Sequence, residues 1–197
     1  MMELDLIVGS GGVLSHAPRR EQSAKMLIDS FLPEGITSLA VDSIFMMPQL
    51  GVMANIDKKS IAEEARVAAL EVFEKDCLIR LGTCVAPVGS MSKSEVPLKI
   101  NLEFKNGEKK SINLQSGELI RVEVGYEEVK AELIPAKGIN VGAGKGEKID
   151  TIIFGGQVGL IFDGRGRPLD VGSDPSVRIS NLKKWASALN EYPELKE

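Results

Sequence analysis

The stretch that decides the fold is LDLIVGSGG, residues 4–12, in which a short apolar run ends in a glycine-rich turn. Three consecutive apolar residues, Leu6 to Val8, are typical of a short buried strand, and the glycines that follow indicate a tight turn. Apolar residues then recur at helical spacing from residue 18 to residue 32, and Pro33 ends the pattern. The sequence therefore begins as strand, turn and helix.

The remainder of residues 1–76 continues this alternation. Residues 38–41 predict a second short strand, and Asp42 or Ser43 is placed to cap the apolar segment 44–52. Residues 60–75 predict a second helix, because alanines and larger apolar residues line one side of it. We interpret residues 1–76 as a partial α/β unit.

From residue 77 to residue 163 the apolar period changes to two. Apolar and polar side chains alternate over residues 100–105, as in a half-buried strand, and Asn106-Gly107 then gives a strong hairpin signal. Similar short runs continue to residue 162 and predict about seven or eight strands. So many short strands favour a closed or nearly closed antiparallel β-barrel, or a sandwich.

A last helix is expected from Pro175 to Asn190, with Asp174 as its N-terminal cap. Its apolar side chains, Val177, Leu182, Trp185 and Leu189, are predicted to dock on the β-domain. The patterns together predict an α+β fold in three parts. These are a partial α/β unit (1–76), an antiparallel β-barrel-like domain (77–172) and a C-terminal helix packed on that domain (173–197).

Composition and charge exclude several classes of function. The 197 residues are 43% hydrophobic and 26% charged, with a formal net charge of −4. The acidic balance argues against a generic nucleic-acid binder and leaves a local basic patch as the alternative, and no apolar run reaches the roughly 20 residues that span a bilayer. The N-terminus lacks the basic flank of a signal peptide, and Cys77 and Cys84 form no CxxC pair. We predict a reduced, cytoplasmic protein with no nucleic-acid or membrane partner.

The glycine turn is the first candidate site. Gly9, Gly11 and Gly12 follow a strand and precede a helix, where backbone amides can face a phosphate or a nucleotide. The turn is not a dinucleotide fingerprint, because Leu14 stands where GxGxxG needs its third glycine. A tight strand–helix connection explains the same glycines, and both interpretations stay open. The glycine-rich segment 138–146 lacks the GxxxxGK[ST] spacing and is predicted to be a wide turn.

The second candidate site is the turn GRGRP at residues 164–168. Its Arg165 and Arg167 suit a carboxylate or phosphate of a partner, and a solvated turn is the alternative. The single histidine, His16, follows Ser15, and sequence neighbours rarely form a nucleophile–base pair. One histidine and two cysteines do not predict a metal site. We therefore predict no catalytic residue and no metal ligand in this chain.

Several segments resemble known families. LIVGSGGVLSHAP (6–18) resembles the adenosine segment of the actin, heat-shock chaperone and sugar-kinase ATPases, and AVDSIFMMPQLGV (40–52) resembles the strand and closing helix that follow it. With LGTCVAP (81–87) and GGQVGLIFDGRGRPL (155–169), these segments are similar to the C-terminal portion of the glutamate mutase L family. That family is unrelated to the mismatch-repair ATPase that shares its short name.

The resemblance implies an actin-like, ribonuclease-H-like ATPase remnant in residues 1–76. Members of the glutamate mutase L family are accessory proteins of adenosylcobalamin-dependent mutases such as glutamate mutase and ornithine aminomutase. Their implied role is ATP-dependent, chaperone-like maintenance of the mutase, in which domain closure opens the mutase so that damaged cobalamin can leave. Of this chain's residues, only Gly9, Gly11 and Gly12 map onto the adenosine turn.

The sequence also departs from the ATPase pattern. The superfamily's earlier Asp-x-Gly-x-Thr turn, which holds the phosphates, occurs nowhere in the chain. We therefore expect a C-terminal fragment or truncated form that has no catalytic activity alone and binds ATP weakly or not at all. The implied partners are mutase subunits, and an incomplete sheet predicts self-association through an exposed edge. The alternative is a free-standing protein-interaction module whose docking surface on the β-barrel includes Arg165, Arg167 and the turn 142–146.

Overall fold

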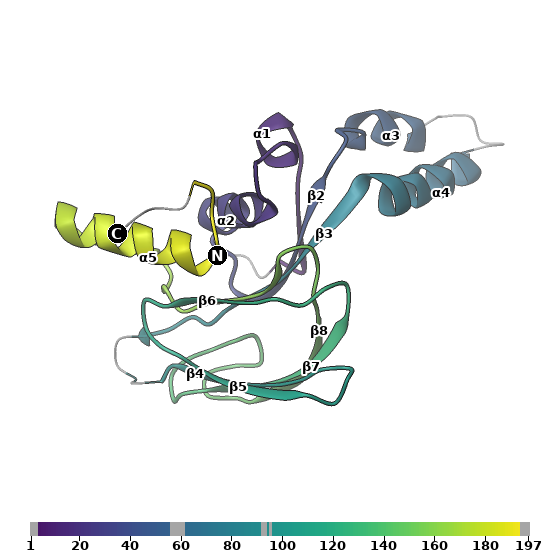
Figure 1. Ribbon diagram of the computed structural model, residues 1–197. Coiled ribbons are helices and arrows are strands. Elements are labelled where there is room, and N and C mark those ends of the chain that lie inside the picture. The colour runs from purple at the N-terminus through teal and green to yellow at the C-terminus, as the bar shows by residue number, and fades with distance from the viewer. Residues whose placement is uncertain (1–3, 56–61, 92–93, 95, 194–197) are drawn as a thin grey trace.

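The computed structural model describes residues 4–55, 62–91, 94 and 96–193. The chain folds as a mixed α+β protein with two β-sheets (Figure 1). In chain order the elements are β1 (Leu6–Gly9), α1 (Gly12–Ser15), α2 (Arg20–Phe31), β2 (Gly35–Asp42), α3 (Met47–Ala54), α4 (Ala62–Val72), the π-helix η1 (Phe73–Cys77), β3 (Leu78–Ala86), β4 (Leu98–Glu103), β5 (Lys109–Leu114), β6 (Leu119–Val122), β7 (Glu128–Pro135), β8 (Ile149–Phe154), β9 (Gly159–Asp163) and α5 (Pro175–Ala188).

The first sheet has the strand order β1-β2-β3-β9-β6 and mixes parallel and antiparallel pairs. β1 runs parallel to β2, β3 pairs antiparallel with β2 and parallel with β9, and β6 is antiparallel to β9. One sheet thus contains strands from both sides of residue 76. The division of the chain into three domains stays a prediction.

The second sheet, β5-β4-β7-β8, is entirely antiparallel. The predicted hairpin at Asn106-Gly107 joins β4 to β5, and Gly107 has the positive φ of 84° that this turn requires. The two sheets pack face to face around one apolar cluster that includes Ile100, Leu133 and Phe162. They are open sheets, so the predicted closed barrel is wrong, and the sandwich alternative describes the packing. The alternation of apolar and polar residues predicted strands in this region, but it does not determine which strands pair with one another.

Helices cover the other face of the first sheet. Leu27 and Ile28 of α2 and Trp185 of α5 share a buried cluster with Leu39 of β2 and Ile161 of β9. The result is three layers, helices over a five-stranded sheet over a four-stranded sheet (Figure 1). The strand β9 is buried on both faces, which explains why its sequence is apolar without alternation up to Phe162 and only its last residue, Asp163, is charged.

The C-terminal helix docks on this body through fewer residues than predicted. Asp174 caps α5 by accepting the amides of Ser176 and Val177, and Trp185 donates its indole N–H to the Gly117 carbonyl at 2.9 Å. Trp185 and Leu189 are buried, as expected. Val177 and Leu182 are exposed, because the buried residues of this helix, Trp185 and Ala186, lie in its last turn.

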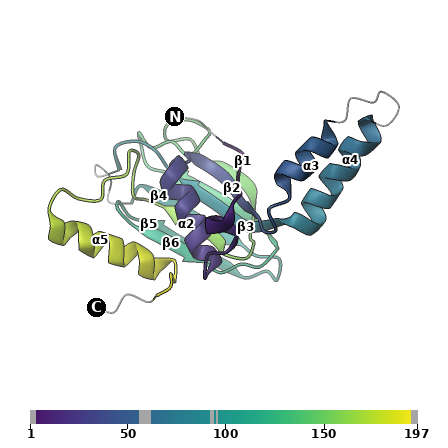
Figure 2. The same ribbon diagram turned by 90° about the horizontal axis from the view of Figure 1, so that it is seen from above.

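The helices α3 and α4 form a hairpin that projects from the body (Figures 1 and 2). Their shared core is small and consists of Leu50, Ala69 and Cys77 with partly buried neighbours such as Met53 and Phe73. We call this hairpin, residues 43–55 and 62–77, the arm. The predicted helix over residues 60–75 is confirmed for residues 62–75 as α4 and the first part of η1, and its first residues lie outside the described part.

The strands β3 and β9 approach unusually closely where Gly82 faces Gly159. A Cβ atom on Gly82 would lie 1.7 Å from the Gly159 carbonyl oxygen, so only glycine fits there. Gly82 and Gly159 also have positive φ values of 141° and 102°. This contact positions β9 beside β3, the central strand of the first sheet.

Candidate functional site

The glycine turn lies at the carboxyl ends of the parallel strands β1 and β2. Gly9 is the last residue of β1 and Gly12 the first residue of α1. A Cβ on Gly9 would lie 2.7 Å from a terminal methyl group of Leu14 and 2.9 Å from one of Leu27, so a larger residue would displace these two side chains, which pack α1 and α2 against the strand. Ligands of α/β sheets bind at such carboxyl ends, and the turn therefore occupies a suitable place.

Gly11 and Gly12 differ from Gly9 because they face open space. No atom lies within 4 Å of a Cβ built on either residue, and Gly11 has a φ of 109°. The carbonyl of Gly11 accepts the amides of Leu14 and Ser15, at 3.1 and 2.9 Å. The amides of Gly12 and Val13 precede these donors, in the part of a helix that has no intrahelical acceptor. The turn thus offers backbone donors at Gly12 and Val13, beside the exposed side chain of Val13.

Asp42 lies beside this turn at the end of β2. Its carboxylate accepts the Ser10 hydroxyl at 3.1 Å and the amides of Met46 and Met47 at 3.1 and 2.9 Å. The residue is fully buried. Burial raises the pKa of Asp42, but the hydrogen bonds from Met47, Met46 and Ser10 outweigh burial and lower it below the ordinary value. Asp42 therefore accepts two amides at the start of α3, although the N-cap residue of that helix is Met46 and neither Asp42 nor Ser43, and both of its carboxylate oxygens already have hydrogen-bond partners.

Ser15 and His16 do not form a catalytic pair with each other. The Ser15 hydroxyl donates to the Gly11 carbonyl at 2.9 Å, and His16 is exposed at the end of α1. The nearby Arg20 donates to the carbonyls of Ser15 and Leu14 at 2.8 and 3.4 Å. These contacts stabilise the shape of the connection between α1 and α2.

Arg165 and Arg167 are inside the protein, which removes them from the predicted docking surface. Their side chains are 0% and 1% exposed. Arg165 forms a paired contact with the buried Asp163, with both N···O distances 2.8 Å, and Arg167 reaches the same carboxylate at 3.0 Å. The Arg165 guanidinium also lies 5.1 Å from the Trp185 ring centre. A side chain without exposed surface cannot contact a partner, so the arginines stabilise the fold.

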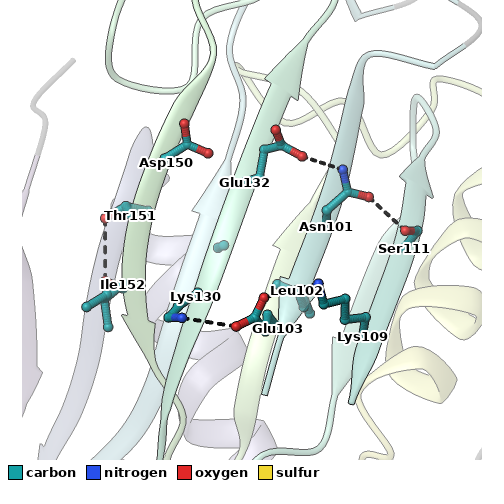
Figure 3. A pocket seen from close by; sticks show the side chains of 11 residues that line it. Asn101, Leu102, Glu103, Lys109, Ser111, Lys130, Glu132, Asp150, Thr151 and Ile152 are labelled. Atoms are coloured by element: carbon teal, nitrogen blue, oxygen red, sulfur yellow. Dashed lines mark hydrogen bonds and ion pairs between the residues drawn. The ribbon is translucent and has the colours of Figure 1, made fainter. Parts of the chain in front are cut away.

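A hollow of about 550 Å³ lies on the outer face of the four-stranded sheet (Figure 3). Two rows of side chains cross it, and the acids in them are paired. Glu103 contacts Lys130 and Lys109 at 3.0 and 3.4 Å, and Glu132 accepts Asn101 and Lys148, each at 2.6 Å. Because these charges compensate each other, the hollow has no evident charge preference for a ligand. Sequence reasoning did not single out this surface, although the polar half of the strand alternation marks it.

The glycine-rich segment 138–146 is a turn between β7 and β8, as predicted. The side-chain oxygen of Asn140 accepts the amides of Gly142 and Gly144, both at 2.9 Å. Within the described residues, no group of three or more His, Cys, Asp or Glu side chains could hold a metal ion. No helix in that part of the chain is long and apolar enough to cross a membrane.

Comparison with known proteins identifies one part of the chain. No curated protein and no solved structure matched. A family model described as MutL protein matches residues 1–76, from the first strand through most of the arm. The segments 81–87 and 155–169 lie outside this match, and their resemblance stays a prediction. Residues 1–76 are thus similar to the glutamate mutase L family, as their motifs predicted.

Proposed function

We propose that residues 1–76 form the adenosine edge of a nucleotide cleft in an ATP-dependent accessory protein. In this proposal the protein maintains or reactivates an adenosylcobalamin-dependent mutase, such as glutamate mutase or ornithine aminomutase. The observation that carries the proposal is the family match over residues 1–76, which contains the glycine turn. ATP, when bound to the intact protein, would supply the energy for a change of conformation.

The geometry of the turn supports a role at the nucleoside. Gly11 and Gly12 have no side chains and no neighbouring atoms on the side where a Cβ would stand, so a flat ring can approach the backbone. The amides of Gly12 and Val13 are suitable donors to ring or ribose oxygens and nitrogens. Gly9 contributes indirectly, because it lets α2 pack closely on β1.

The same region is poorly suited to the phosphates. Asp42 is negatively charged, and its oxygens are occupied by Ser10, Met46 and Met47. A carboxylate in this place repels a phosphate and has little capacity left to bind Mg²⁺. The Asp-x-Gly-x-Thr turn that grips phosphates in the superfamily is absent from the 197 residues. We therefore assign phosphate binding to groups outside this chain.

Titration of the chain with adenosine and with ATP-Mg tests the assignment. We expect both ligands to bind weakly and within about threefold of each other, because the phosphates gain little charge stabilisation. The Gly12→Val variant places a branched side chain in the open space beside Gly12 and should abolish the binding of both adenosine and ATP-Mg. Gly51→Val is a matched control, since Gly51 also has no neighbouring atoms but lies in α3.

Two results would contradict the proposal. Micromolar ATP binding that depends on the phosphates would require a complete nucleotide site within these residues. Equal binding by wild type and Gly12→Val would place the nucleoside elsewhere.

The interaction with a mutase is tested separately, by sedimentation of the chain with purified glutamate mutase subunits. Failure to co-sediment with or without adenosylcobalamin would remove this mutase as a partner of the chain.

A further inference from the structure

Within the part of the chain that the structure describes, two helices expose apolar side chains on one face. Among the described residues, seventeen large apolar side chains are exposed, and seven of them belong to the arm. On α4, Val67 and Leu70 are 45% and 53% exposed and lie on one face with Glu63 and Glu71. On α5, Ile179 and Leu182 are 57% and 39% exposed. We call these the α4 face and the α5 face.

The two faces carry opposite charge. Residues 62–77 of the arm contain five acidic and two basic residues, a net charge of −3. Residues 175–188 contain Arg178, Lys183 and Lys184 and no acidic residue, a net charge of +3. Glu63 and Glu71 form ion pairs with Arg66 and Lys75 of the same helix pair, at 2.7 and 3.8 Å. The net charge of −3 therefore comes from the remaining acids, Glu64, Glu74 and Asp76. The α4 face thus combines apolar side chains with a negative charge, and the α5 face combines apolar side chains with a positive charge. Two such surfaces are complementary.

The faces cannot meet within one molecule. The arm and α5 lie at opposite ends of the body in both views (Figures 1 and 2). The inner sides of both helices are already used, by Leu50, Ala69 and Cys77 in the arm and by Trp185 and Leu189 in α5. Only the outer sides are open to another molecule.

We propose that this chain self-associates head to tail, with the α4 face of one copy packed on the α5 face of the next. Such a contact joins two different surfaces, so each added copy again presents one free face of each kind. The product is an open chain or a ring. This contact is independent of the nucleotide role proposed above, and it does not use the sheet edge predicted from the sequence.

Sedimentation velocity of the full chain measures the association. The weight-average mass should rise from 21.3 kDa as protein concentration increases from about 5 μM to about 500 μM, because two short apolar contacts give weak binding. Raising the salt to about 0.5 M should reduce the rise, since the charged rims are exposed. Leu70→Glu and Ile179→Glu should each abolish association, and Ile152→Glu, at an equally exposed site on β8, should leave it unchanged.

Mixing the two defective variants gives the sharpest test. Leu70→Glu retains the α5 face and Ile179→Glu retains the α4 face, so a mixture should form a complex of one copy of each and stop there. Its mass should approach twice 21.3 kDa without larger species. A wild-type chain that stays monomeric at about 500 μM would overturn the proposal. Failure of the mixture to associate, or association that survives both substitutions, would overturn it as well.

Discussion

The ends of the first sheet hold two buried aspartates that are stabilised in different ways. Asp42, at the end of β2, is surrounded by neutral donors, namely two backbone amides and one hydroxyl. Asp163, at the end of β9, is surrounded by two guanidinium groups. Each residue is fully buried and each has a lowered pKa. A buried carboxylate can therefore be stabilised by neutral hydrogen-bond donors or by positively charged groups. We expect the two arrangements to lose different amounts of free energy of unfolding when the aspartate is replaced.

The largest expected effect comes from Asp163→Asn. The substitution keeps the size of the side chain but removes the charge that Arg165 and Arg167 share, so that Asp29, 2.8 Å from Arg165, is the carboxylate still paired with these two buried arginines. We expect a loss of about 3–5 kcal/mol in the free energy of unfolding, measured by urea denaturation. Asp170→Asn is the control, because Asp170 is exposed and accepts only the Gly172 amide. Equal losses in the two variants would show that Asp163 has no special role.

Asp42→Ala should cost less, about 1–3 kcal/mol, because it removes the acceptor of amides and a hydroxyl rather than of cations. Asp42→Asn should recover part of this loss, since its amide oxygen can still accept a backbone N–H. Urea denaturation of both variants measures the difference. The comparison would be wrong if Asp42→Ala were more damaging than Asp163→Asn.

Acid should reduce the difference between wild type and Asp42→Asn. Burial raises the pKa of Asp42, the hydrogen bonds from Met47, Met46 and Ser10 lower it, and the folded-state pKa lies below the unfolded one. The stability contributed by this group is therefore complete above about pH 5 and is lost as the pH falls through the folded-state pKa. The two urea midpoints should converge between about pH 6 and about pH 2. A constant difference would show that the charge of Asp42 contributes nothing.

The smallest expected effect is a change in the rate at which the two cysteine thiols are labelled when the nearby aspartate is replaced. Burial first, and then the charge of Asp42, raises the pKa of the Cys77 thiol, while burial and Asp163 raise that of Cys84. Neither thiol should react with a disulfide reagent in the native wild type. Asp42→Ala should accelerate labelling of Cys77 alone, and Asp163→Asn should accelerate labelling of Cys84. Identical rates for both thiols in each variant would mean that the protein opens only globally.

Local features of this fold were predictable from the sequence, and long-range ones were not. The hairpin at Asn106-Gly107 and the cap at Asp174 depend on residues that are neighbours in the chain. The strand β3 was missed as a central strand, because burial on both faces removes the alternation of period two. The prediction of a closed barrel was wrong because β3 pairs with β9, and a pairing between segments far apart in sequence leaves no local pattern.

The candidate site shows the same limit. Gly11 and Gly12 were predictable as an open turn because strand, glycines and helix follow one another. Arg165 and Arg167 lie between glycines and a proline, a pattern typical of the surface. Their burial depends on Asp163 before the turn and on Trp185 in the next helix, and no local pattern contains both.

The contact between Gly82 and Gly159 has a consequence for the time course of folding. The parallel pairing of β3 and β9 cannot form until the whole segment between them has been brought back to the first sheet. Long loop closures of this kind slow folding, because their entropy is lost before the contacts compensate for it. On the ribosome, β1 and β2 emerge long before β9, so the first sheet is completed only after residues 159–163 have been made. Synthesis of β9 is therefore the step that joins the strands β1, β2 and β3 to β6 in one sheet.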